Sequence, residues 1–171
     1  IEVLLLTDPV DIIVVPSIPE FDGKKLVSID KADVHVSSSE EAKEPSTLDS
    51  ALLTLFKEVL GEKVEDVLPS KRLVDSAVTL VVGKEGLDAQ MERMMKMLDK
   101  DFKGGRKVLE VNMEHPLIKN LSRLQLADAG SPLLRQYILH LYEGALLIES
   151  NLASPALFVR RMTEIMTDAT K

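Results

Sequence analysis

A pair of helices joined by a very short loop is the feature that most limits how this chain can fold. Ser131-Pro132 and Ser154-Pro155 are both typical helix starts, because proline is favoured at the first helical position. Only the segment Ser150–Ala153 separates the two predicted helices, which run to about residues 150 and 168. A loop this short makes the helices antiparallel neighbours.

Both helices carry apolar residues at the spacing of a seam that packs along another helix. The seam residues are Leu134, Ile138, Leu141, Ala145 and Ile148 in the first helix and Phe158, Met162 and Ile165 in the second. Leu139, Leu146 and Leu147 lie beside the first seam, so the apolar surface is wider than one partner helix covers.

Two coverings of this surface are consistent with the pattern. The hairpin packs on the rest of its own chain, or it meets a twofold copy and forms a four-helix bundle across a homodimer. The spacing of apolar residues is the same in both cases, so the pattern alone leaves both open.

The composition excludes several classes of function. The chain has 171 residues, 45% of them hydrophobic and 29% charged, as in an ordinary globular protein. Its net charge of −7, with no Trp and two Tyr, argues against a nucleic-acid surface. The sequence contains no membrane-spanning apolar run and no signal peptide, so a membrane is not an expected partner. The absence of Cys excludes disulfides and thiolate chemistry.

The first third of the chain indicates the end of one unit and a linker. The run Ile1–Leu6 is strand-like and Phe21–Lys24 is a turn, as in an α/β unit. Because the sequence starts inside that strand-like run, we expect a piece of a longer protein. Residues 37–50 begin with a polar stretch that has no apolar period, which is typical of a linker, and we place a domain boundary there.

The order of the later elements predicts an α+β fold, with a small mixed sheet flanked by helices and followed by the hairpin. A helix whose apolar face runs from Leu48 to Leu60 ends at Gly61. The remaining predicted elements are strands at 64–68, 77–82 and 107–111, a helix at 86–98 and a helix after Pro116.

The sequence offers no catalytic, cofactor or metal site. The turn Gly83–Gly86 lacks the spacing of a phosphate-binding loop, and no serine-hydrolase elbow is present. The three His are far apart and there is no Cys to complete a zinc site. We expect the basic pair Lys71-Arg72 to be neutralised by a nearby carboxylate such as Asp75 rather than to bind an anion.

One predicted helix is rich in methionine. Met91, Met94, Met95 and Leu98 share one helical face, and the helix holds four of the chain's seven Met. Flexible thioethers suit a surface that must contact many different apolar partners. The alternative, which the pattern alone favours, is that this face covers the adjacent sheet.

Five motifs resemble the C-terminal part of the 90-kDa heat-shock chaperone family, and in particular its bacterial members. The motifs span nearly the whole chain and keep the family's order; they are Glu20–Leu26, Lys71–Ser76, Met91–Lys96, Asn112–Ile118 and Phe158–Met162. Each is weak alone, but five in register are specific.

The resemblance implies a division of the chain and a role for each part. Residues 1–36 would be the tail of the family's middle domain, 37–50 a linker, and 51–171 the dimerisation domain. The eight seam residues would then form a four-helix bundle with the partner subunit. Met91, Met94, Met95 and Leu98 would contact unfolded or partly folded client proteins.

The resemblance also implies a cytoplasmic chaperone that assists protein folding under stress. ATP and magnesium would be bound by the family's N-terminal domain, outside this chain, so we expect this chain to be non-catalytic and without a cofactor. The alternative is a monomeric protein-binding module whose C-terminal helices pack in cis.

Two departures from the family pattern qualify the resemblance. The segment Asp11–Val15 is more aliphatic than the acidic and aromatic run usual there. The sequence ends at Lys171 without the Glu-Glu-Val-Asp tail of the eukaryotic cytosolic members. We therefore expect a bacterial or organellar protein without tetratricopeptide-repeat cochaperones.

Overall fold

The computed structural model describes residues 3–8, 10–27, 47–83, 94–95, 97–98 and 105–170. Near the N-terminus, α1 (Asp11–Val14) leads into the 3-10 turn η1 (Val15–Ser17) and a hairpin of β1 (Glu20–Phe21) and β2 (Lys24–Lys25). The hairpin confirms the predicted turn: Asp22 and Gly23 have φ of 49° and 72°, as a two-residue connection requires. Residues 3–7 are in neither helix nor strand, so that part of the strand predicted at 1–6 is wrong.

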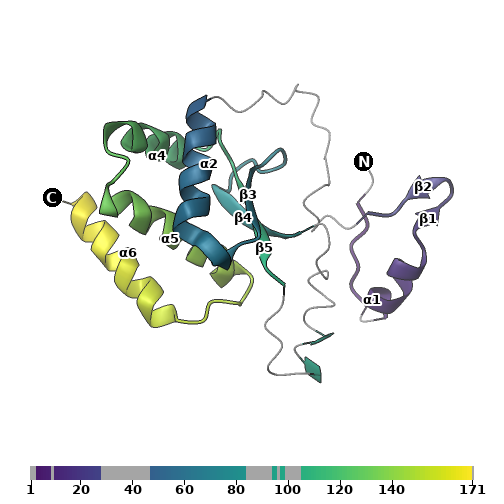
Figure 1. Cartoon of the computed structure of the whole chain (residues 1–171). Coiled ribbons are helices and arrows are strands. Elements are labelled where there is room, and N and C mark those ends of the chain that lie inside the picture. Colours follow the sequence, from purple (N-terminus) through teal and green to yellow (C-terminus); the bar gives the residue numbers. More distant parts are fainter. Residues whose placement is uncertain are drawn as a thin grey trace.

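A three-stranded sheet lies at the centre of the larger part of the chain (Figure 1). The strands are β3 (Asp66–Pro69), β4 (Val78–Val82) and β5 (Lys107–Val111), with β5 in the middle. β3 is parallel to β5 and β4 is antiparallel to it, which confirms the predicted mixed sheet. Their Val and Leu residues suit strands that are buried in a core.

Among the fully described elements, four helices accompany the sheet: α2 (Thr47–Leu60), α4 (Pro116–Ala127), α5 (Pro132–Ile148) and α6 (Pro155–Ala169). Figure 1 shows α2, α4 and α5 gathered beside the sheet, with α6 on the outer side of α5. α2 ends where predicted, at Gly61, whose φ of 51° is easily adopted only without a side chain. Thr47–Ser50 are already helical, so the segment predicted as a linker ends earlier.

The core joins one face of each inner helix to the sheet. α2 contributes Leu52, Phe56 and Leu60, and α4 contributes Ile118 and Leu121, all of them almost fully buried. The sheet adds Leu109 and Val111 of β5, and α5 adds Leu134, Ile138 and Ala145. The α+β architecture is therefore held together by one continuous apolar cluster.

A buried polar group fixes the loop between β3 and β4. The Glu110 carboxylate accepts from Ser70 Oγ at 2.9 Å and from Arg72 Nε at 3.0 Å. The Asn112 side chain donates to the carbonyls of Val74 and Ser76. Arg72 is thus neutralised as expected, but its partner is Glu110 rather than Asp75.

Replacing Ile138 with Ala tests the position of α5 in the core. Ile138 is 0% exposed, whereas Ile148 on the same helix is 84% exposed. We expect Ile138→Ala to lower the free energy of unfolding by about 2–5 kcal/mol because it leaves a cavity. Ile148→Ala, the matched control, should change it by less than about 0.5 kcal/mol. Urea denaturation measures both values, and equal losses would contradict this packing.

Candidate functional site

The predicted seam of the C-terminal hairpin divides into two sets of residues. Leu134, Ile138 and Ala145 are buried in the core of their own chain, and Leu141 packs against the same cluster. Leu134, Ile138 and Ala145 are buried because α5 turns this face toward α2 and β4, while Leu141 is half-buried. The role of these four residues in a dimer interface stays a prediction. Ile148 lies at the end of α5 and is exposed.

The second helix of the hairpin is much less covered. α6 packs on α5, and not one of its residues is buried. Phe158 and Ile165 are half-buried, whereas Met162 is exposed. The role of these three residues in an interface stays a prediction.

An aromatic stack and an ion pair form the contact between α5 and α6. The rings of His140 and Phe158 stack with centroids 4.4 Å apart and planes 14° from parallel. Next to them the Arg161 guanidinium pairs with the Glu143 carboxylate. His140 Nδ1 is buried and has no hydrogen-bond partner within the described part of the chain. This contact depends on the mutual geometry of a few groups rather than on a large apolar area.

The environment of His140 lowers the pKa of its imidazole. The largest cause is burial, which disfavours the charged ring. The Glu143 carboxylate opposes this effect, and the Arg161 guanidinium adds to it. The neutral ring is therefore the form that this contact favours.

The two sides of α6 differ in chemistry. One side carries Val159, Met162 and Met166, spaced so that they share a face, and each is at least 37% exposed. We call these three residues the apolar flank. The other side carries Arg160, Glu164 and Asp168, which we call the polar flank.

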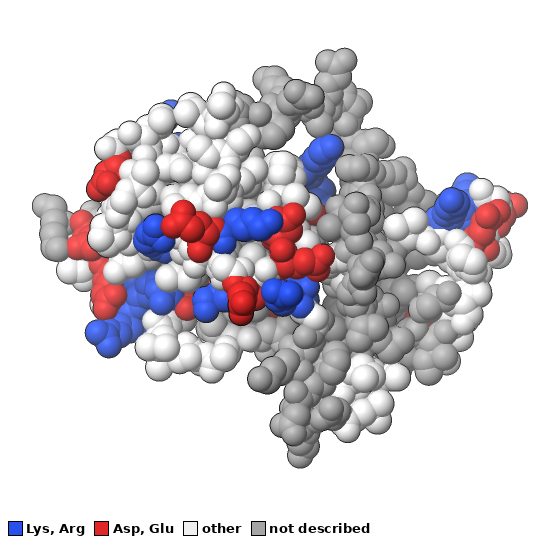
Figure 2. All heavy atoms as spheres, in the orientation of Figure 1, with Lys and Arg blue, Asp and Glu red and all other residues white. Residues whose placement is uncertain are grey.

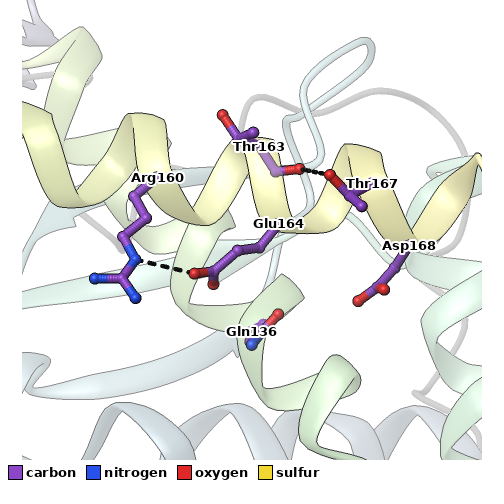
Figure 3. A pocket seen from close by; sticks show the side chains of 6 residues that line it. All are labelled: Gln136, Arg160, Thr163, Glu164, Thr167 and Asp168. Atoms are coloured by element: carbon purple, nitrogen blue, oxygen red, sulfur yellow. Dashed lines mark hydrogen bonds and ion pairs between the residues drawn. The ribbon is translucent and has the colours of Figure 1, made fainter.

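A shallow groove lies along the polar flank (Figure 3). In the figure Arg160 reaches toward Glu164, and their ion pair measures 3.0 Å. Thr167 Oγ1 donates to the carbonyl of Thr163 at 2.8 Å. The groove therefore contains groups that already bind one another, and its lining residues include none of the hydrophobic or aromatic side chains typical of a small-molecule site. The lining residues are Gln136, Arg160, Thr163, Glu164, Thr167 and Asp168.

The structure describes only part of the methionine-rich segment, residues 91–98, which we call the methionine segment. Met94, Met95 and Leu98 are helical, while Met91 lies outside the described residues. Met94 and Leu98 are exposed and Met95 is half-buried. Contact of these four residues with client proteins stays a prediction.

The surface carries both charges in alternation. Figure 2 shows Lys and Arg interleaved with Asp and Glu over the face in view. Two of the pairs are Lys57 with Asp66 at 2.7 Å and Arg135 with Glu58 at 2.9 Å. Among the described residues there is no cluster of three His, Asp or Glu side chains that could hold a metal ion. Within the same residues, none of the helices has the length and apolar character needed to span a membrane.

Comparison with known proteins assigns the chain to a family. The model of the family described as "Hsp90 protein" matches residues 1–171. The chain belongs to the Hsp90 family. Within that family it is similar to chaperone protein HtpG of Chlorobium luteolum, with 54% identity over 99% of this chain. The proteins of the same name from Chlorobium phaeovibrioides and Geobacter metallireducens are 52% and 40% identical, over 99% and 96% of this chain.

The Hsp90-family relatives are much longer than this chain. It spans 28% of the length of the Chlorobium luteolum protein and 27% of the Geobacter metallireducens protein.

Two features of the α5–α6 hairpin were not identified from the sequence, the apolar flank and the stacking of His140 on Phe158. The spacing of Val159, Met162 and Met166 by three and four residues is a signal that could have found the apolar flank. The stacking of His140 on Phe158 had no such signal, because it joins two helices whose relative rotation the sequence does not state.

Acidification should loosen the α5–α6 contact through His140. Because its pKa is lowered in the folded chain, the unfolded chain binds this proton more readily. The contribution is therefore fully present above about pH 7 and is lost as the pH falls through the ordinary range of histidine near 6.5 and below.

Replacing His140 with Phe isolates this effect, because the variant keeps an aromatic ring against Phe158 but cannot be protonated. We expect wild-type protein to lose more stability than His140→Phe between about pH 8 and about pH 5.5, measured as urea midpoints. Equal losses in the two proteins would show that His140 does not cause the pH dependence.

Proposed function

We propose that this Hsp90-family chain is the C-terminal part of a cytoplasmic chaperone that assists protein folding under stress, and that it holds two subunits together. The observation that carries the proposal is the apolar flank of α6, which lies uncovered on a helix without a buried residue. The similarity to proteins named chaperone protein HtpG supports the chaperone role. In the whole protein, ATP and magnesium would be bound outside this chain.

The exposed side of α6 favours a second copy as its partner. α6 has 15 residues, and a helix of that length is only marginally stable unless an apolar face is packed. Its packing on α5 leaves Val159, Met162 and Met166 open. In a twofold interface the same flank is used by both copies, so each buried side chain contributes twice.

We infer a four-helix bundle in which the two α5–α6 hairpins meet through their apolar flanks. This differs from the seam predicted from the sequence, since α5 uses Leu134 and Ile138 for its own core. Met162 is common to the predicted seam and the apolar flank. The alternative is a monomeric protein-binding module in which the hairpin packs only in cis and the flank faces solvent.

Placing charges on the apolar flank should separate the subunits. We expect wild-type protein to sediment as a dimer at about ten micromolar, and the double variant Met162→Glu/Met166→Glu to raise the dissociation constant about a hundredfold or more. The fold should survive, because both side chains are exposed in the single chain.

Leu157→Glu is the matched control, since Leu157 is equally apolar and exposed but projects from the side of the polar flank. It should leave the dissociation constant within about threefold of the wild type. Wild-type protein that is monomeric at this concentration, or a double variant that stays dimeric, would favour the monomeric module.

We also propose that the methionine segment contacts client proteins. Met94 and Leu98 are exposed apolar side chains, and a flexible thioether adapts to partners of irregular shape. An unfolded protein offers many different apolar segments, which suits such a surface.

Removing this apolar surface should weaken client binding and leave the fold intact. We expect Met94→Ser/Leu98→Ser to bind a reduced, carboxymethylated, permanently unfolded protein about tenfold more weakly than wild type does, as measured by fluorescence anisotropy. Val74→Ser, at an exposed position in the β3–β4 loop, is the control and should bind normally. A melting temperature that drops in the double variant, with client binding unchanged, would mean that these side chains serve the core.

We further propose that this chain neither binds nor hydrolyses ATP. The segment Gly83–Gly86 lacks the residue spacing of a phosphate-binding loop, and a nucleotide site elsewhere in the longer protein would account for the family's ATP dependence. Calorimetric titration with magnesium ATP should give no saturable heat. Micromolar binding by this chain would overturn the proposal.

A further inference from the structure

A partly buried ion pair joins the sheet to the corner between α5 and α6. The ammonium of Lys107 lies 2.9 Å from both carboxylate oxygens of Glu149. The two side chains are only 12% and 23% exposed. Lys107 is the first residue of β5, and Glu149 directly follows α5. The pair therefore connects parts of the chain that are far apart in sequence.

The sheet holds the lysine firmly. Lys107 is paired with Val82 of β4, and its carbonyl accepts from the backbone N–H of Glu65 at 2.8 Å. Lys107 is thus a fixed point from which a long side chain reaches the corner.

The corner has a defined shape that depends on Glu149. Ser150 has a φ of 59°, a left-handed backbone conformation that residues other than glycine and asparagine seldom adopt. The N–H of Asn151 donates to the carbonyl of Leu146 at 2.8 Å, and its side-chain amide donates to Glu149 Oε2 at 3.3 Å. These bonds turn the chain out of α5 and set the direction in which α6 begins.

The negative charge of Glu149 does not stabilise α5, the helix that precedes it. A carboxylate at the C-terminal end of a helix lies next to the negative end of the helix dipole, which is unfavourable. A cation is favoured there, and Lys107 supplies it from the sheet. The pair therefore contributes to the position of the corner rather than to α5 alone.

Within the described part of the chain, few other contacts fix α6. Its packing partner is α5, which it meets through half-buried residues. The exposed pair Arg135–Glu58 holds the other end of α5 against α2, where a surface ion pair is worth little. A small rotation at the corner would displace the far end of α6, because the corner sets the direction in which the whole helix runs.

We propose that Lys107 and Glu149 are positioning residues that fix the direction of α6 and so hold its apolar flank where a second copy can meet it. The inference rests on the proposed dimer for its consequence, but the fixed direction of α6 belongs to the single chain. Breaking the pair leaves the core of α2, α5 and the sheet in place and frees the corner.

Spin labels can measure the direction of α6 directly, because the chain has no Cys of its own. Ala51→Cys on α2 and Ala169→Cys on α6 place labels at two exposed positions. With an excess of unlabelled chain, only distances within one chain are recorded. We expect a single narrow distance distribution in the otherwise wild-type protein, and a broadened or shifted one after Glu149→Gln or Lys107→Met.

The same variants should weaken dimerisation about tenfold in sedimentation experiments. The double variant should be no worse than the single ones, because the two residues act as one unit. Arg135→Met is the control and should change neither the distances nor the dissociation constant. Glu149→Gln keeps the shape of the side chain and its acceptor for Asn151, so it remains informative if Lys107→Met fails to fold.

Unchanged distances in both single variants, or effects that add in the double variant, would overturn the inference. A wild-type chain that proves monomeric would overturn the proposed dimer instead, while the distance distributions would still test the positioning role. The two failures are therefore distinguishable.

Discussion

The burial of one face of α5 is the constraint on which the rest of the structure depends. Leu134 and Ile138 are fully buried between α2 and the sheet, and each such side chain stabilises the fold by about 1.5–3 kcal/mol. With its inner face used in this way, α5 can offer a second helix only its outer side. α6 occupies that side, and its own outer surface becomes the outer surface of the hairpin (Figure 1).

The contacts differ in kind from the inside to the outside of this hairpin. The inner contact of α5 is apolar and closely packed, whereas its contact with α6 consists of a stacked pair of rings, an ion pair and half-buried side chains. Polar contacts of this kind contribute modestly to stability but restrict the geometries that satisfy them. The hairpin is thus attached to the core through α5. The contacts of α6 set its orientation but stabilise it less than the core stabilises α5.

Much of the fold could be predicted from the sequence, because its elements carry local signals. The Ser-Pro starts of α5 and α6, the glycine after α2 and the valine-rich strands identified them to within a few residues. The function of the apolar seam could not be read in the same way. A helix that packs on its own core and one that packs on a second copy show the same period, so the sequence did not reveal that the single chain buries Leu134 and Ile138 in its own core.

The ion pairs between residues far apart in the chain could not be predicted from the sequence either. Glu110 forms an ion pair with Arg72, and Lys107 forms one with Glu149. Both Glu110 and Lys107 lie on β5, the middle strand of the sheet, so these pairs depend on the strand order. Strand order is decided by long-range packing, and no local pattern states it. Asp75 was the nearest carboxylate to Arg72 along the chain, but the folded sheet brings Glu110 closer.

The placement of β4 and β5 as adjacent antiparallel strands has a consequence for how this protein can diverge. The connection between them, residues 83–106, includes four of the seven methionines and has to return only to the neighbouring strand. The entropy of closing such a connection grows slowly with its length, by about 0.6 kcal/mol for each doubling. A change in the length of this connection can therefore leave the register of β4 and β5 intact.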